Sequence, residues 1–123
     1  MKIIIDTHIF LWALAEPSKI EKSKLERLRL MSNTIYVSAI TVTELMIKTS
    51  IGKLSIDFDV IEMIEKSGFE QLDFTAADAL KLKEMPFHHK DPFDRMLIAQ
   101  AQENNFFLMS DDSKFSKYDC KLI

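Results

Sequence analysis

The chain has 123 residues, a formal net charge of -3, and 47% hydrophobic and 28% charged residues. This length suits one domain over residues 1–123 with a single core and is too short for two ordinary domains, while the composition excludes a disordered or fibrous protein. The acidic balance gives no broad basic face for a nucleic acid, so a polyanionic substrate would need positive charge from another source.

The cysteine content and the apolar runs indicate the expected cellular location of the protein. Cys120 is the only cysteine, which excludes an internal disulfide and fits a reducing compartment. The run Ile3-Ile4-Ile5 is far shorter than the roughly 7 to 15 residues of a signal-peptide core. No apolar run approaches the ~20 residues that span a bilayer. We therefore expect a cytoplasmic protein with no membrane contact.

Four short segments are expected to form strands. They lie at residues 3–5, 35–37, 69–72 and 106–109, and the third reads Phe-Glu-Gln-Leu while the others are unbroken apolar runs. Unbroken apolar runs of this length are typical of strands that are buried on both faces, as in a parallel sheet. Because helical patterns separate them, the sequence predicts an α/β fold with a mostly parallel central sheet.

Helices are predicted between these strands from apolar periodicity and capping residues. In chain order they cover the stretch around residues 9–13, the charged stretch around 25–30, residues 41–50, residues 75–84, and a helix that begins after Asp91. Thr75 and Asp78 form a capping-box pattern, and Asp91-Pro92 is a cap followed by proline. On the helix over 41–50, the stripe expected to face the core consists of Val42, Leu45, Met46 and Thr49.

Acidic residues follow two of the predicted strands. Asp6 ends the first strand, and Asp111-Asp112 follow the strand over 106–109 after Ser110. In an open parallel sheet the ligand crevice lies beyond the carboxyl ends of the strands. Capping of the next helix is the alternative role for each of these acids.

Glu44 occupies an unusual place on the helix over 41–50. It lies about 160° from the centre of the core stripe, with Ile40 and Ile47 as its neighbours at i−4 and i+3. A carboxylate in a second apolar line is unlike a solvated surface acid, because burying an unpaired charge is expensive. The alternative is that Glu44 points past these isoleucines into water or pairs with Lys48.

Asp94 lies in the first turn of the helix that Asp91 is expected to cap. Its neighbours at i+3 and i+4 are Leu97 and Ile98, which directs it toward the interior. A favourable interaction with the helix dipole, worth about 0.3 to 1 kcal/mol, is the competing explanation, but an exposed acid would gain it equally. We therefore assign Asp91 to capping and Asp94 to function.

Converging carboxylates at Asp6, Glu44, Asp94 and Asp112 would require a cation. Their repulsion and desolvation would otherwise raise their pKa values, and hard oxygen ligands suit Mg²⁺ or Mn²⁺. Such ions activate water and stabilise charge on phosphate oxygens during phosphodiester hydrolysis. No serine or cysteine nucleophile motif and no Walker-type glycine loop offers another chemistry.

The loop before Asp91 contains adjacent histidines, His88 and His89, which we expect to be solvated rather than metal ligands. Lys90 and Arg95 lie near Asp94 in sequence and could contact a substrate phosphate. The hydroxyl residues beside the strand-end acids, Thr7 and Ser110, are further candidates for substrate contact.

Four segments of the sequence resemble the PIN domain, and most of all the VapC-type toxins of bacterial toxin–antitoxin pairs. They are Ile3 to Trp12 (IIIDTHIFLW), Val37-Ser38-Ala39 leading to Glu44, Asp91 to Gln100 (DPFDRMLIAQ), and Ser110-Asp111-Asp112. The resemblance covers essentially the whole chain, in order, and its Asp-Pro-Phe-Asp-Arg segment is specific.

This resemblance implies a PIN-like α/β/α sandwich and a ribonuclease site in which Asp6, Glu44, Asp94 and Asp112 coordinate Mg²⁺ or Mn²⁺. The family's last motif, a hydroxyl residue, any residue and an aspartate, favours Asp112 over Asp111. It also implies a homodimer silenced by a cognate VapB-like antitoxin.

Three alternatives remain at this stage. A housekeeping RNA-processing PIN nuclease would use the same acids. A non-catalytic acidic-pocket module, such as a receiver-like signalling domain, needs an acidic pair beside the first strand, where Asp6 stands alone. A degenerate PIN domain used for protein binding is disfavoured because all four acids are present.

Overall fold

A five-stranded parallel sheet forms the centre of the computed structural model, which describes residues 1–123. Its strands are β1 (Lys2–Ile5), β2 (Thr34–Ser38), β3 (Glu70–Leu72), β4 (Phe107–Met109) and β5 (Lys121–Leu122). They lie in the order β3-β2-β1-β4-β5, and every neighbouring pair is parallel. The expectation of a mostly parallel sheet is confirmed, and β5 is a strand that the apolar runs did not predict.

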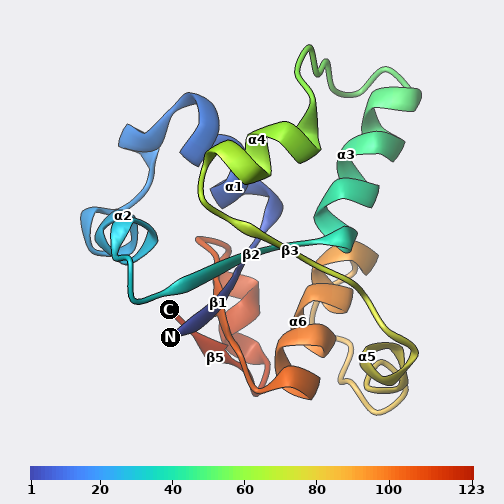
Figure 1. The fold of residues 1–123 in the computed structure, drawn as a ribbon. Helices are drawn as coiled ribbons and strands as arrows, with labels where there is room; N and C mark the ends of the chain where they lie inside the picture. The colour runs from blue at the N-terminus through green and yellow to red at the C-terminus, as the bar shows by residue number, and fades with distance from the viewer.

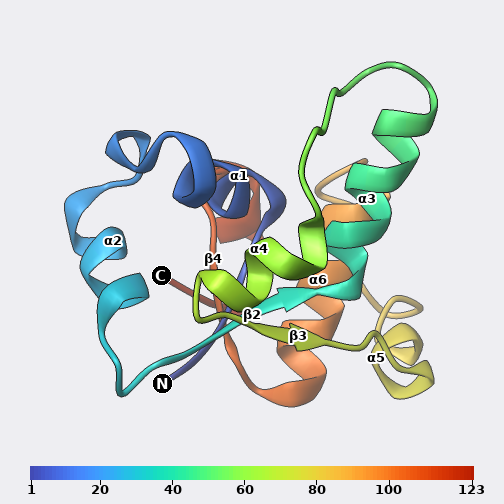
Figure 2. The same cartoon turned by 45° about the horizontal axis from the view of Figure 1, so that its top comes forward.

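Six α-helices connect and cover these strands. They are α1 (Thr7–Ala15), α2 (Lys22–Arg29), α3 (Ala39–Ser50), α4 (Val60–Lys66), α5 (Ala76–Leu80) and α6 (Pro92–Asn104), with short 3₁₀ helices η1 (Pro17–Lys19) and η2 (Ser113–Lys117). The helices α1, α2 and α4 lie on one side of the sheet and α5 and α6 on the other, while α3 extends away from the end of β2 (Figures 1 and 2). None of these helices combines the length and the apolar character needed to cross a membrane.

Two hydrophobic cores, one on each face of the sheet, hold the layers together. On β1, Ile3 and Ile5 belong to the core beneath α1 and α4, and Ile4 belongs to the core beneath α6. All three side chains are completely buried, as expected for a central strand whose side chains alternate between covered faces. The α/β/α sandwich is therefore confirmed.

Two helix predictions need correction. The capping box of Thr75 and Asp78 is present, but α5 ends at Leu80 and gives way to turns, so the predicted helix over 75–84 was too long. On α3, Leu45 is buried while Met46 is 44% exposed, and the predicted core stripe was wrong at Met46. The later turns of α3 project beyond the sheet, so no layer covers that position (Figure 1).

Candidate active site

The carboxyl ends of β1 and β4 form the floor of the acidic site. These strands are neighbours in the centre of the sheet, and from β1 the strand order runs outward in both directions, which is the position where open α/β sheets bind ligands. The backbone N–H of Asp6 donates to the carbonyl of Met109 over 3.1 Å. This bond fastens the segment after β1 beside the segment after β4.

Asp6 is buried and caps α1 through a 2.9 Å hydrogen bond from the Ile9 backbone N–H to its Oδ1. Burial raises the pKa of Asp6 above its ordinary value, while the Ile9 backbone N–H and the nearby Ser110 hydroxyl act in the opposite direction. The capping role and a place in the acidic site therefore coexist.

Glu44 is 4% exposed on the inner side of α3. Thr7 donates a 2.6 Å hydrogen bond to its Oε1, and Lys48 pairs with its Oε2 over 2.5 Å. The pairing with Lys48, considered above as an alternative to a site role, is present, but the carboxylate does not point into water. Through Thr7, Glu44 lies next to the segment that carries Asp6.

Asp94 lies in the first turn of α6, where Asp91 caps the helix by accepting hydrogen bonds from the backbone N–H groups of Phe93 and Asp94. The capping role assigned to Asp91 is confirmed. Burial, followed by the negative charge of Asp91, raises the pKa of Asp94 to about 6, and the charge of Asp6 acts in the same direction. Asp94 is thus a partly buried carboxylate that is costly to ionise without a cation nearby.

Asp112 and Asp111 point to different partners. Asp112 caps η2 by accepting a 2.9 Å hydrogen bond from the Lys114 backbone N–H, and its other oxygen faces the same histidine as Asp94. Asp111 instead pairs with Lys24 of α2 over 2.6 Å. Of the two, Asp112 is the acid beside Asp94.

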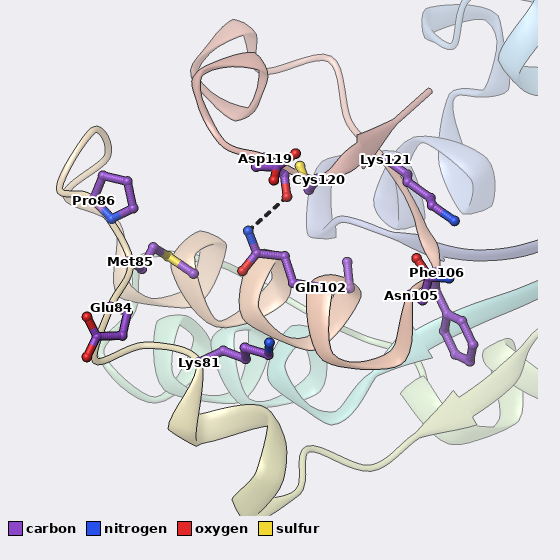
Figure 3. Close-up of a pocket in the computed structure, with 11 residues that line it drawn as sticks. Lys81, Glu84, Met85, Pro86, Gln102, Asn105, Phe106, Asp119, Cys120 and Lys121 are labelled. Carbon is purple, nitrogen blue, oxygen red and sulfur yellow. Dashed lines mark hydrogen bonds between the residues drawn. The ribbon is translucent and has the colours of Figure 1, made fainter.

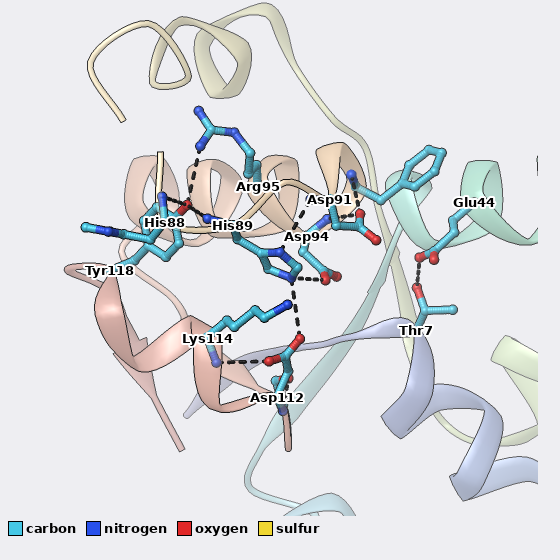
Figure 4. A network of polar contacts seen from close by, with 12 residues as sticks. Thr7, Glu44, His88, His89, Asp91, Asp94, Arg95, Asp112, Lys114 and Tyr118 are labelled. Carbon is cyan, nitrogen blue, oxygen red and sulfur yellow. Dashed lines mark hydrogen bonds and ion pairs between the residues drawn. The ribbon is translucent and has the colours of Figure 1, made fainter. Parts of the chain in front are cut away.

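His89 joins these two acids, which the sequence did not indicate. It is 8% exposed, and its Nε2 lies 2.8 Å from Oδ2 of Asp94 and 3.4 Å from Oδ2 of Asp112 (Figure 4). The expectation that both histidines are solvated is right for His88 and wrong for His89. Nothing in the polar loop signalled this, because the contacts that bury His89 come from distant residues.

The segments that carry the four predicted acids lie at the carboxyl edge of the sheet, but of these acids only Asp94 and Asp112 belong to the group of close ligand atoms, and Asp6 and Glu44 lie outside it. The structure joins Asp94 and Asp112 through His89, and it joins Glu44 to the Asp6 segment through Thr7. Ligand atoms of His89, Asp94 and Asp112 all lie within 4.8 Å of one another. A set dominated by carboxylate oxygens, with two aspartates whose pKa values burial raises, fits a hard divalent cation.

The candidates for substrate contact divide into two groups. The hydroxyl of Thr7 is already bonded to Glu44, and that of Ser110 lies near Asp6 and accepts from the backbone N–H of Asp112. Lys90 is exposed, whereas Arg95 donates to Oη of Tyr118 over 3.3 Å and lies over the Phe87 ring at 4.9 Å. Arg95 thus holds the loop before α6, and Lys90 is the exposed cation near Asp94 in sequence.

The largest cavity lies elsewhere, between the later turns of α6, the loop after α5 and the C-terminal segment (Figure 3). It measures about 540 Å³ and contains none of the four acids. Cys120 lines it, and burial, followed by the charge of Asp119, raises the pKa of its thiol. A thiol kept protonated is a poor nucleophile.

Comparison with known proteins agrees with this architecture. The chain resembles solved structures of VapBC2 from Rickettsia felis bound to a promoter DNA fragment (TM-score 0.76, 20% identity, 100% of this chain and 98% of that chain) and of DNA-bound VapBC from Salmonella typhimurium (TM-score 0.69, 16% identity, 100% and 97%). It also resembles VapBC-1 from nontypeable Haemophilus influenzae (TM-score 0.67, 18% identity, 100% and 97%). No curated protein sequence matches the chain. A model of the PIN domain matches residues 3–121, and the chain therefore belongs to the PIN-domain family.

Proposed function

We propose that this PIN domain is a metal-dependent endoribonuclease, acting as the toxin of a toxin–antitoxin pair. Its ligands for Mg²⁺ or Mn²⁺ are Asp6, Glu44, Asp94 and Asp112. The proposal is supported by the contacts at the carboxyl edge of the sheet: Asp94 and Asp112 face the same His89 nitrogen, Thr7 beside Asp6 bonds Glu44, and the charge of Asp6 acts on Asp94. When bound there, the ion activates water and stabilises the charge on the phosphate and the leaving oxygen.

The chain's own residues supply the rest of the site. Thr7 orients the carboxylate of Glu44 through a hydrogen bond, and the Ser110 hydroxyl lies near the carboxylate of Asp6. Lys90 is exposed and can pair with a phosphate of the RNA backbone. Since the chain is acidic overall, the ion and this local lysine together provide the positive charge that holds the substrate.

The role as a toxin rests on kinship. The similar solved structures are of VapBC proteins, and this supports a VapB-like antitoxin as the partner of this chain. We extend the same reasoning to a homodimer, to a cytoplasmic location and to residues 1–123 acting as one domain. A small reading frame directly upstream that encodes a DNA-binding protein is expected, and its product should suppress cleavage when mixed with the chain.

An RNA cleavage assay tests the activity. We expect the wild type to cleave RNA with Mg²⁺ or Mn²⁺ and to lose activity with chelator. Asp94→Asn should be inactive, because it removes one ligand charge while keeping the shape of the side chain. Asp57→Asn is the matched control, since Asp57 is exposed and outside the acidic site. Equal cleavage by Asp94→Asn and Asp57→Asn would refute the proposed site.

A further inference from the structure

His89 lies between two of the proposed ligands and has no role so far. Its ring bridges Asp94 on α6 and Asp112 after β4, over 2.8 Å and 3.4 Å respectively. These carboxylates belong to segments that are far apart along the chain. In Figure 4 the imidazole stands between them and directs one nitrogen toward both.

The hydrogen bond at Nδ1 of His89 determines whether Nε2 carries the ring proton. The backbone N–H of Asp91 donates to Nδ1 of His89 over 3.4 Å. A backbone N–H can only donate, so Nδ1 accepts and the ring proton lies on Nε2. A histidine that binds a metal usually shows the reverse arrangement, because its other nitrogen donates to a carbonyl or a carboxylate. His89 therefore donates its Nε2–H to Oδ2 of Asp94, while Oδ2 of Asp112 lies 3.4 Å from the same nitrogen without a hydrogen bond.

The ring is also held in place by the fold. The backbone N–H groups of His88 and His89 donate to Oη of Tyr118 over 3.0 Å and 2.8 Å. The imidazole meets the ring of Phe115 edge-on, with centroids 6.2 Å apart and planes at 76°. Tyr118 and Phe115 are both buried. The position of Nε2 is thus set by packed residues of the C-terminal segment.

This inference rests on the proposed function. We propose that His89 is a positioning residue whose Nε2–H fixes Asp94 beside Asp112, so that both aspartates bind one divalent ion, and that His89 does not ligate that ion. The hydrogen bond uses Oδ2 of Asp94, and Oδ2 of Asp112 faces the same nitrogen. A carboxylate has about four lone-pair sites, so both groups keep oxygen lone pairs for a cation. The N–H between them also offsets part of the repulsion between two neighbouring carboxylates.

Binding of Mn²⁺ alone to the purified chain, measured by calorimetry, tests this role. His89→Phe keeps an aromatic ring against Phe115 but removes the donor, and we expect about a tenfold to hundredfold loss of affinity, as for other partners of metal ligands. His89→Gln, which offers an amide N–H, should restore most of the affinity. His88→Phe, at the exposed neighbour, is the matched control and should bind as the wild type does.

Pulsed electron paramagnetic resonance on the Mn²⁺-loaded wild type, with ¹⁵N-labelled histidine, provides a second test that needs no variant to fold. We expect no directly coordinated nitrogen. A coordinated imidazole nitrogen would overturn the positioning role, and so would unchanged Mn²⁺ affinity in a folded His89→Phe or no rescue by a folded His89→Gln.

The Asp94→Asn variant separates this inference from the proposed function. If Asp94→Asn binds Mn²⁺ as tightly as the wild type, the proposed metal site itself is wrong. If Asp94→Asn loses binding while His89→Phe retains it, the metal site stands and only the role of His89 fails.

Discussion

Thr7 and Glu44, 37 residues apart in the sequence, are joined by a 2.6 Å hydrogen bond from the Thr7 hydroxyl to Oε1 of Glu44. Thr7 directly follows Asp6, and Glu44 lies on α3, so the bond connects two proposed metal ligands through one intermediate residue. Both partners are buried, and a buried carboxylate that loses a donor is not compensated by water.

Thr7→Val should therefore destabilise the metal-free protein. Valine keeps the shape of threonine but leaves Oε1 of Glu44 without its donor, a loss of about 1–3 kcal/mol for a buried acceptor. Chemical unfolding in the presence of chelator measures this change. Thr7→Ser retains the hydroxyl and is the control, so equal unfolding free energies for the two variants would contradict the role of the bond.

Glu44→Gln should weaken Mn²⁺ binding while leaving the chain folded. The amide oxygen can still accept from Thr7, but the negative charge that attracts a cation is gone. Calorimetry with Mn²⁺ and thermal unfolding together test this expectation. Glu62→Gln is the control, because Glu62 also pairs with a lysine four residues later but is exposed. A large loss of stability in Glu44→Gln, with unchanged Mn²⁺ affinity, would instead indicate a structural role.

Asp94 should make the stability of the metal-free protein depend on pH. Its pKa is about 6 in the fold against an ordinary value of 3.8, so between these values the folded chain binds the proton more tightly than the unfolded chain. The contribution of Asp94 to stability therefore falls as pH rises from about 4 to 6, and its full cost is present above pH 6. Asp94→Asn removes this cost.

Thermal unfolding in chelator at about pH 7.5 and about pH 4.5 tests this sign. Asp94→Asn should unfold at a higher temperature than the wild type at the upper pH, and the difference should shrink at the lower pH. Mn²⁺ affinity should change in the opposite sense and weaken as pH falls below about 6, because proton and ion compete for the same carboxylate. If the difference in unfolding temperature between the wild type and Asp94→Asn were the same at both pH values, Asp94 would not be the group that makes stability depend on pH.

The parts of the fold that could be predicted are those encoded locally. Strands β1, β2 and β4 each contain an apolar run, and the caps at Thr75 and Asp91 depend on residues within a few positions. Strand β3 contains a single apolar residue, Leu72. The two-residue strand β5 includes Lys121 and has no such run. It exists because it pairs with β4.

The same distinction applies to the site. Glu44 and Asp94 could be identified because each interrupts a local apolar pattern. Their surroundings could not, because those come from distant segments: Tyr118 holds the backbone of His89 from 29 positions away, and Lys24 pairs with Asp111 across 87 positions. Contacts between residues so far apart in the sequence cannot be predicted from local residue spacing.

Lys48 and Lys66 provide the sharpest comparison of an ion pair inside the site with one outside it. Each pairs with a glutamate four residues earlier, but the side chain of Glu44 is 5% exposed and that of Glu62 is 54% exposed. Lys48→Met should cost about 1–2 kcal/mol of stability. Lys48 itself is partly solvated, but its removal leaves the buried carboxylate of Glu44 without its ion-pair partner. Lys66→Met should cost about 0–0.5 kcal/mol.

The two lysines should also differ in their effect on metal binding. The positive charge of Lys48 interacts with Glu44, Asp91 and Asp94, so it competes with a cation for the same negative charge. Lys48→Met should therefore bind Mn²⁺ more tightly than the wild type in calorimetry, although it is less stable, whereas Lys66→Met should bind it unchanged. Weaker Mn²⁺ binding by Lys48→Met would mean that the lysine helps to build the ion's site, because a competing charge can only strengthen binding when it is removed.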